Sequence, residues 1–166
     1  MTNNDIMRRI RYTFDFNDAK MIAIFDSVGQ KVTRELISNW LKKDDDPAFS
    51  SCNDTHMALF LNGLINEKRG KKDGPQPVPE TQLVNNTIFM KLKIALNLKA
   101  EDVLEILSLA NFNLGKHELS AFFRKPGHKH YRECKDQVLR YFLKGMQAKY
   151  RDDRDVCGEF ETSEDK

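Results

Sequence analysis

The chain has 166 residues, of which 40% are hydrophobic and 31% are charged, and its formal net charge is +2. This length and composition are typical of a globular protein with one domain or two very small ones. No stretch approaches the roughly 18 uninterrupted apolar residues of a membrane span, and the first residues lack the basic-then-apolar order of a secretory signal. Three cysteines without dense spacing argue against a disulfide framework and indicate a reducing cytoplasm.

The sequence contains an internal repeat. Residues 3–69 align with residues 85–151 at a constant offset of 82 positions and without a gap. Apolar residues replace apolar ones at many other matched positions, and identical residues occur along the whole alignment, as in Asn4/Asn86, Ile24/Ile106, Cys52/Cys134, Phe60/Phe142 and Gly63/Gly145. We therefore predict two copies of one module, at residues 1–69 and 85–151.

Each copy has the apolar periodicity of helices. In the first copy we expect a helix after the paired Asn3 and Asn4, a second over residues 18–27, a third from the capping residue Thr33, and a fourth after Asp54. The fourth is the clearest, because its apolar residues recur at i, i+3, i+4 and i+7.

Residues 70–84 separate the copies and contain three alternating prolines, which favour an extended, semi-rigid spacer. The second copy repeats the helical pattern, including a helix over residues 101–109. A module of this size is marginally stable alone. The predicted fold is therefore all-α, with two tandem four-helix modules, about eight helices in all, packed as a pseudo-symmetric pair.

Both copies contain an aromatic-x-x-Cys-x-Asp motif, ending in Cys52 and Asp54 or in Cys134 and Asp136. The structural interpretation is a buried thiol followed by an aspartate that caps the last helix. The functional alternative is a reactive or metal-binding thiol at a helix N-terminus. Because the copies share no histidine to activate a thiol, we favour the structural interpretation.

Gly63 and Gly145 lie inside the most regular predicted helices, where glycine costs up to about 1 kcal/mol relative to alanine. The same cost in both copies indicates a close approach of two backbones. The contact between the modules is one candidate for this approach, and an approaching ligand is the less favoured alternative.

The second copy holds 13 Lys and Arg residues against 6 Asp and Glu residues, whereas the first holds 10 of each. A basic stretch with an interleaved aromatic residue can bind phosphates and stack a base. It is also compatible with a solvated face, or with self-association through the oppositely charged Asp44–Asp46 of the first copy. The candidate anion- or nucleic-acid-binding residues are Arg124, Lys125, His128, Lys129, His130, Tyr131, Arg132, Lys135 and Arg140.

His128, His130, Cys134 and Cys157 do not have the spacing of an established zinc site, so we expect no bound metal. The sequence also lacks a P-loop, a dinucleotide glycine fingerprint, a serine elbow and a zincin helix. We assign no catalytic residues and no cofactor.

Residues 152–166 carry seven acids and two bases, a net charge of −5, which leaves +7 on the rest of the chain. Val156 and Phe160 are their only large apolar residues. Such a segment cannot bury enough surface to offset the entropy of ordering it. We expect a disordered acidic tail.

Two segments resemble the YehS-like bacterial family, a catalogued domain of unknown function. They are Phe60–Gly70 and Arg124–Gly145, the second with the run Tyr131-Arg132-Glu133-Cys134. The resemblance covers almost all of residues 3–150, including the duplication. It implies a small bacterial cytoplasmic protein and supplies no catalytic residues.

The sequence favours a non-enzymatic helical binding or adaptor protein that uses either the groove between the copies or the basic surface of the second copy. A nucleic-acid-binding protein is the alternative, and a thiol or metal function at the repeated cysteines is the third. The expected partner is another protein or a second copy of the chain; nucleic acid is possible, and a membrane is not expected.

Overall fold

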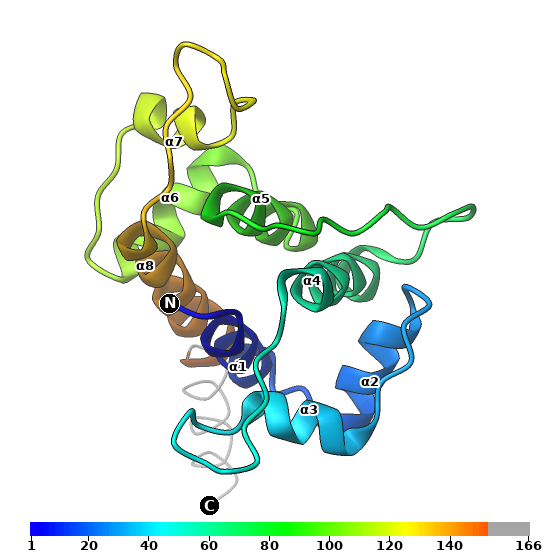
Figure 1. Cartoon of the computed structure of the whole chain (residues 1–166). Coiled ribbons are helices and arrows are strands. Elements are labelled where there is room, and N and C mark those ends of the chain that lie inside the picture. Colours follow the sequence, from blue (N-terminus) through cyan, green and yellow to red (C-terminus); the bar gives the residue numbers. More distant parts are fainter. Residues whose placement is uncertain (153–166) are drawn as a thin grey trace, which may run out of the picture.

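The computed structural model describes residues 1–152. Within this range the chain forms eight α-helices and a final π-helical turn, which confirms the predicted all-α class (Figure 1). The elements are α1 (Asn3–Phe14), α2 (Asp18–Asp26), α3 (Arg34–Leu41), α4 (Asp54–Arg69), α5 (Asn85–Ala95), α6 (Ala100–Leu109), α7 (Lys116–Phe122), α8 (Asp136–Gln147) and η1 (Ala148–Asp152). Of the helices in this range, none is both long and apolar enough to cross a membrane.

The modules pack through their first and last helices. Helix α4 of the first module lies against α5 of the second, and α1 of the first lies against α8 of the second (Figure 1). Both pairs are parallel. Met1 contacts Asp136 at the beginning of α8, and Arg151 contacts Tyr12 near the end of α1. In the other pair, Asp54 at the beginning of α4 contacts Leu83 just before α5, and Arg69 at the end of α4 contacts Ile94 near the end of α5. The predicted pseudo-symmetric pair is therefore confirmed, with two equivalent seams between the modules.

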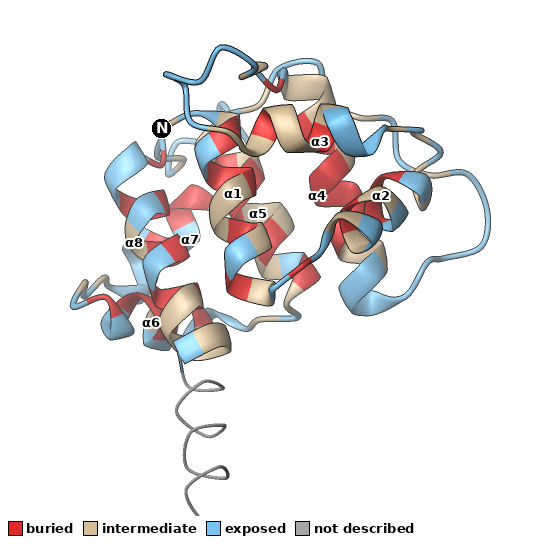
Figure 2. Ribbon diagram, turned by 90° about the horizontal axis from the view of Figure 1, so that it is seen from below, coloured by how far each residue is buried: buried red, intermediate tan, exposed pale blue. Residues whose placement is uncertain are grey.

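One hydrophobic core runs through both modules. Phe25 and Phe60 are completely buried in the first module, and Phe89 and Phe142 are completely buried in the second. Each pair is in ring contact, with centroids 5.8 Å and 4.7 Å apart. Buried residues form stripes on the faces that the helices turn toward one another (Figure 2). Because the buried stripes of the two modules meet at the α4/α5 and α1/α8 seams, each module covers apolar surface of the other.

The paired asparagines are the first two residues of α1 and α5, not the residues before these helices. Asn4 is buried, and its amide Nδ2 donates to the carbonyl oxygens of Trp40 and Ser50, each at 2.9 Å. Its Oδ1 accepts from the backbone N–H of Cys52 at 3.0 Å. Asn86 makes the equivalent three bonds in the second module. This amide fixes the loop before the last helix onto the first helix.

The prediction that Asp54 and Asp136 cap the last helices is wrong. The N-cap of α4 is Asn53, whose side chain accepts from the N–H of His56, and the N-cap of α8 is Lys135, which makes no side-chain cap bond. The aspartates occupy the next position in each helix. Their carboxylates are used for contacts with more distant parts of the chain.

Each aspartate joins the two modules. Asp54 accepts from the amide of Asn3 at 2.8 Å in its own module and from the backbone N–H of Leu83 at 2.9 Å, just before α5. Asp136 accepts from Asn85 at 2.7 Å in its own module and from the amino group of Met1 at 2.8 Å, just before α1. The four contacts are related by the same offset of 82 residues as the sequence repeat.

The two mid-helix glycines allow a close backbone approach within each module. A Cβ atom on Gly63 would lie 2.3 Å from the carbonyl oxygen of Ile24 in α2, and one on Gly145 would lie 2.0 Å from that of Ile106 in α6. The suggestion that these glycines mark the contact between the modules is therefore wrong.

The linker, residues 70–84, runs from the end of α4 back to the beginning of α5 (Figure 1). Side chains of the linker contact both α4 and α5. Gln76 accepts from Asn66 of α4 at 3.0 Å, and Glu80 pairs with Lys91 of α5 at 3.1 Å. The linker therefore lies along the α4/α5 seam.

Candidate anion-binding groove between the modules

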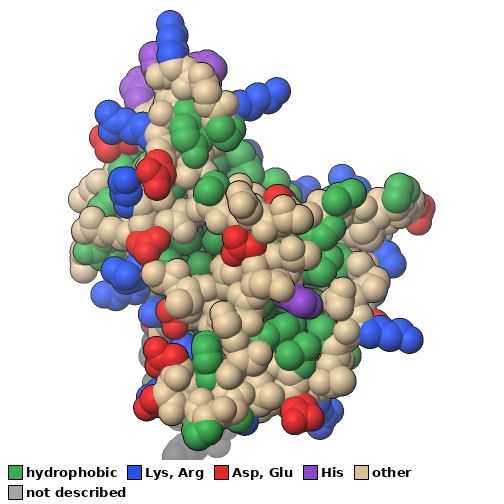
Figure 3. Space-filling view, in the orientation of Figure 1, with side chains coloured by type: hydrophobic (Ala, Val, Ile, Leu, Met, Phe, Trp, Pro, Cys, Tyr) green, Lys and Arg blue, Asp and Glu red, His purple; other side chains and the backbone are tan. Residues whose placement is uncertain are grey.

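The structure separates the nine predicted anion-binding residues. Seven of them belong to the basic loop, residues 124–132, which connects α7 to α8. Figure 3 shows basic and histidine side chains gathered at this end of the molecule. Together with α7, five of the seven line a hollow of about 420 Å³: Arg124, Lys129, His130, Tyr131 and Arg132.

The other predicted residues lie around or away from this hollow. Lys125 and His128 are exposed in the same loop, where His128 Nδ1 accepts from the backbone N–H of His130 at 3.1 Å. Lys135 pairs with Glu133 at 3.1 Å. Arg140 lies in α8, on the surface that faces α1. The predicted patch is thus one loop, a lysine that follows this loop, and an arginine that belongs to a different site.

The repeated cysteines are both buried. Burial, and then the charge of the neighbouring Asp54, raise the pKa of Cys52 to about 12. Burial, and then the charge of Asp136, raise the pKa of Cys134 to about 12. Both side chains are therefore neutral thiols at neutral pH, whereas nucleophiles and metal ligands are thiolates.

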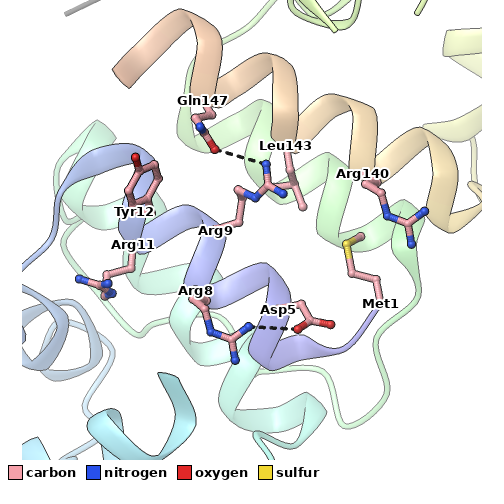
Figure 4. A pocket seen from close by; sticks show the side chains of 9 residues that line it. All are labelled: Met1, Asp5, Arg8, Arg9, Arg11, Tyr12, Arg140, Leu143 and Gln147. Carbon is pink, nitrogen blue, oxygen red and sulfur yellow. Dashed lines mark hydrogen bonds and ion pairs between the residues drawn. The ribbon is translucent and has the colours of Figure 1, made fainter. Parts of the chain in front are cut away.

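A groove of about 520 Å³ lies between α1 and α8, along one of the two seams (Figure 4). We call it the inter-module groove. One wall is formed by α1 and by Met1, which precedes this helix. The other wall is formed by α8. Its lining residues are Met1, Asp5, Arg8, Arg9, Arg11, Tyr12, Arg140, Leu143 and Gln147.

Arginines dominate the polar lining of the groove. Arg9 reaches across from α1, and its Nη1 donates to the side-chain oxygen of Gln147 in α8 at 3.3 Å (Figure 4). Arg140 stands near the beginning of α8, and Arg11 points away from α8 in this view. Arg9 and Arg140 are therefore the cations that a ligand between the two helices would meet first.

Arg8 is partly committed to the fold. Its guanidinium donates to the carbonyl oxygens of Leu41 and Lys42 at the end of α3, at 3.0 Å and 2.7 Å. A third contact, at 3.2 Å, goes to Asp5. Arg8 therefore contributes positive charge to the groove while it satisfies the last carbonyl groups of a neighbouring helix.

Asp5 is the one carboxylate among the lining residues, against four arginines. Burial alone would raise the pKa of Asp5, but hydrogen bonds from Thr2 and Arg8 and the charge of Arg8 lower it. Asp5 is thus ionised and already paired at neutral pH. The remaining charge of the lining is positive, which favours an anionic ligand.

The second seam contains a bound acidic group at the equivalent place. The offset of 82 residues maps Arg9 of α1 onto Lys91 of α5. Lys91 donates to Asn62 of α4 at 2.6 Å across the seam, as Arg9 does to Gln147, and it also pairs with Glu80 of the linker at 3.1 Å. The linker therefore places the carboxylate of Glu80 beside the residue that corresponds to Arg9.

The two seams differ in side chains as well as in occupancy. Ala58 of α4 is completely buried, whereas its counterpart in α8, Arg140, is exposed. Similarly, Ile65 of α4 corresponds to Gln147 of α8. The α4/α5 seam thus has apolar side chains at the two positions where the α1/α8 seam has Arg140 and Gln147.

Sequence reasoning missed Arg8, Arg9 and Arg11, because the first module has no net charge. The available signal was local: three arginines fall within four residues of a predicted helix. Their pairing with Arg140 was not visible, because it depends on the contact between α1 and α8.

The site offers binding groups and no evident reaction centre. Within residues 1–152, no three His, Cys, Asp or Glu side chains come together as a metal site. The groove presents guanidinium groups, a phenol ring and the apolar edges of Met1 and Leu143. Guanidinium groups bind carboxylates and phosphates through paired N–H donors.

Comparison with known proteins gives two matches. A family model described as "Protein of unknown function (DUF1456)" matches residues 3–70 and again residues 85–152. The chain is 43% identical over 150 residues to the "Uncharacterized protein YehS" of Escherichia coli (strain K12), an alignment that covers 90% of this chain and 96% of that protein. No solved structure matches. The family model therefore recognises the same unit on each side of the linker.

Proposed function

The chain belongs to the family described as a protein of unknown function (DUF1456), and we propose that it is a binding protein that holds an acidic, extended segment of a partner protein in the inter-module groove. The resemblance to the YehS-like family is confirmed by the same matches. Neither match names an activity. The proposal is therefore based on the groove.

One observation carries the proposal: the linker lies along the equivalent seam and inserts Glu80 beside Lys91. By the pseudo-symmetry of the modules, Arg9 in the α1/α8 seam corresponds to Lys91 in the α4/α5 seam. An extended peptide with a carboxylate at the matching place has the shape and charge to occupy the inter-module groove. A polypeptide is favoured over a small anion, because the linker that lies along the α4/α5 seam is itself a polypeptide.

The side chains of the groove suit such a ligand. Arg9 and Arg140 lie on facing helices, so that different carboxylates of one acidic peptide can meet both of them. Tyr12 and Leu143 offer apolar contacts between the charged groups. An ion pair in such an exposed groove contributes up to about 1 kcal/mol.

A labelled peptide of alternating glutamate and proline tests the proposal, because it combines carboxylates like that of Glu80 with the extended, proline-containing backbone of the linker. We expect the full-length protein to bind it, as measured by fluorescence anisotropy. The double variant Arg9→Ala/Arg140→Ala should bind about tenfold or more weakly, which is about 1.4 kcal/mol. The matched control, Arg124→Ala/Lys129→Ala, removes the same charge from the basic loop and should bind as the parent does. Equal losses in the two double variants, or no binding by the parent, would refute the proposal.

A second candidate function is nucleic-acid binding by the basic loop. The observation in its favour is the hollow of about 420 Å³ that gathers Arg124, Lys129 and Arg132 around Tyr131. Phosphate contacts together with base stacking on an aromatic ring are the usual means of binding single strands.

A labelled oligothymidylate of 15 nucleotides tests this candidate with the same two double variants. Binding should weaken steeply with salt and be lost in Arg124→Ala/Lys129→Ala, whereas Arg9→Ala/Arg140→Ala should keep it. The absence of any shift at low ionic strength would eliminate nucleic acid as the ligand.

We propose a cytoplasmic location, which the free, buried thiols of Cys52 and Cys134 support because they fit a reducing compartment.

A further inference from the structure

We propose that the acidic segment of the chain itself, residues 153–166, occupies the inter-module groove and competes there with the partner peptide. This inference rests on the proposed function in that both ligands use the same groove. Residues 153–166 lie outside the described part of the chain, so their place is argued from where that part leads and from their charge.

The first step is positional. The offset of 82 residues maps Asp152 onto Gly70, the first residue of the linker, and maps residues 153–166 one for one onto residues 71–84. The linker leaves α4 and lies along the α4/α5 seam, where Glu80 meets Lys91. The described chain ends at Asp152 of η1, beside the α1/α8 seam, and the acidic segment continues from there. A second module built like the first therefore directs this segment toward the open groove.

The second step is the anchor at the end of the described chain. Arg151 donates to the carbonyl oxygen of Tyr12 at 2.6 Å, and its guanidinium carbon lies 3.8 Å from the centroid of the Tyr12 ring. Tyr12 also lines the inter-module groove. The described chain therefore ends beside the groove.

The third step is charge. Residues 153–166 contain six acids and two bases, and the groove lining contains four arginines and one aspartate. The sequence Glu-Thr occurs in the linker as Glu80-Thr81 and in the acidic segment as Glu161-Thr162, one residue from exact register. Glu161 is therefore the residue that we expect opposite Arg9, as Glu80 is opposite Lys91.

The fourth step explains why the segment can be displaced. The linker meets a seam with buried Ala58 and a single lysine, whereas the α1/α8 seam stays open with Arg140 exposed. Ion pairs in such an exposed groove are individually weak and sensitive to salt. An occupant that is held in this way exchanges with a competing acidic peptide, so the segment acts as an internal competitor.

Zero-length cross-linking tests the contact directly. A carbodiimide joins a carboxylate to a lysine amine as an amide, and the water that is lost converts the carbodiimide to a urea. The variant Arg9→Lys places an amine where the second module already has Lys91. The ion pair of Lys91 and Glu80, at 3.1 Å, is the positive control within the same molecule.

We expect peptide mass spectrometry to find a cross-link from position 9 to an acid of residues 153–166, most abundantly Glu161. Finding the Lys91–Glu80 cross-link without one from position 9, or finding the acidic segment joined only to Lys125 and Lys129 of the basic loop, would overturn the proposal. Mixing ¹⁴N- and ¹⁵N-labelled protein separates the two possible origins of a cross-link. Cross-links between unlike labels would show that the segment of a second copy fills the groove, which also overturns the intramolecular contact.

A second measurement keeps this inference separate from the proposed function. In the full chain with Glu159→Gln, Glu161→Gln and Glu164→Gln, the glutamate–proline peptide should bind several-fold more tightly than in the parent. A cross-link without peptide binding in either protein would support the internal contact and refute the proposed function. Unchanged peptide affinity together with no cross-link would refute the internal contact and leave the proposed function standing.

Discussion

A single buried amide in each module joins three parts of the backbone. Asn4 satisfies the carbonyl groups of Trp40 and Ser50 and the N–H of Cys52, and Asn86 does the same in the second module. Because buried backbone groups without partners are costly, one side chain here stabilises a loop that has no secondary structure of its own. The residue also positions the buried cysteine of the repeated motif.

Substitution of the mid-helix glycines tests the tightness of the helix contacts. The variant Gly145→Ala would place a Cβ 2.0 Å from the backbone oxygen of Ile106, so that α6 and α8 must separate. We expect a loss of about 1–3 kcal/mol in the free energy of unfolding, in spite of the better helix propensity of alanine. The adjacent Lys144→Ala, at an exposed position, is the control and should change stability by less than about 0.5 kcal/mol. Chemical denaturation measures both, and an unchanged Gly145→Ala protein would contradict the close approach.

The repeated thiols should resist modification in the native protein. Burial raises the pKa of both Cys52 and Cys134 to about 12, so almost no thiolate is present at pH 8. Iodoacetamide should therefore label these two cysteines slowly in buffer and rapidly in denaturant, as followed by peptide mass spectrometry. Rapid labelling of the folded protein at either position would instead support a reactive thiol.

The last helix of each module begins with a carboxylate that reaches into the other module. Hydrogen bonds from the Met1 amino group and then from Asn85 lower the pKa of Asp136. A lowered pKa means that the contribution to stability is present above about pH 4 and is lost as the pH falls through the folded-state value. The side chain is 50% exposed, so screening limits this contribution to about 0.2–1 kcal/mol.

The variant Asp136→Asn should therefore lose stability at pH 7 by this small amount and show a shallower decline between about pH 4 and pH 2. Thermal unfolding across that range measures the effect. The control is Glu105→Gln, an exposed substitution in α6. It should leave the decline of the unfolding temperature at acid pH as it is in the parent. If the unfolding temperature of Asp136→Asn declined at acid pH as it does in the parent, the contact with Met1 would contribute nothing to stability.

Sequence periodicity predicted the elements well, because each helix buries a regular stripe. The predicted helices at residues 18–27 and 101–109 correspond to α2 and α6 within one residue, and Thr33 caps α3. The capping role of Asp54 was wrong because the adjacent Asn53 serves that helix end equally well. The sequence could not show that the carboxylate has a partner at Leu83, since that contact crosses between modules.

The two modules should not be stable separately. Each contributes its first and last helix to the seams, so that residues 1–69 alone would expose the face of α4 that α5 covers. A module of this size leaves much apolar surface in water even when it is folded. We expect residues 1–69 and 85–152, produced separately, to show no cooperative thermal transition at the temperature of the whole chain. Circular dichroism of each part and of the whole provides the measurement.

The candidate site could not be predicted from the sequence for a reason that belongs to the whole molecule. Its cations come from Arg8, Arg9 and Arg11 at one end of the chain and from Arg140 near the other. Only the parallel packing of α1 on α8 brings them together. By contrast, the basic loop is contiguous in sequence, and five of its residues do surround one hollow.

The equivalence of the two seams has a topological consequence. The linker closes one seam only because it joins residue 69 to residue 85, while residue 152 and Met1 lie beside the other. A circular permutant that begins at Asn85 and carries the linker sequence between residue 152 and Met1 would keep every helix contact. It would, however, route that sequence along the α1/α8 seam. The order of the modules along the chain would then decide which seam the linker covers and which seam keeps an open groove. The helices that form the seams would not decide it.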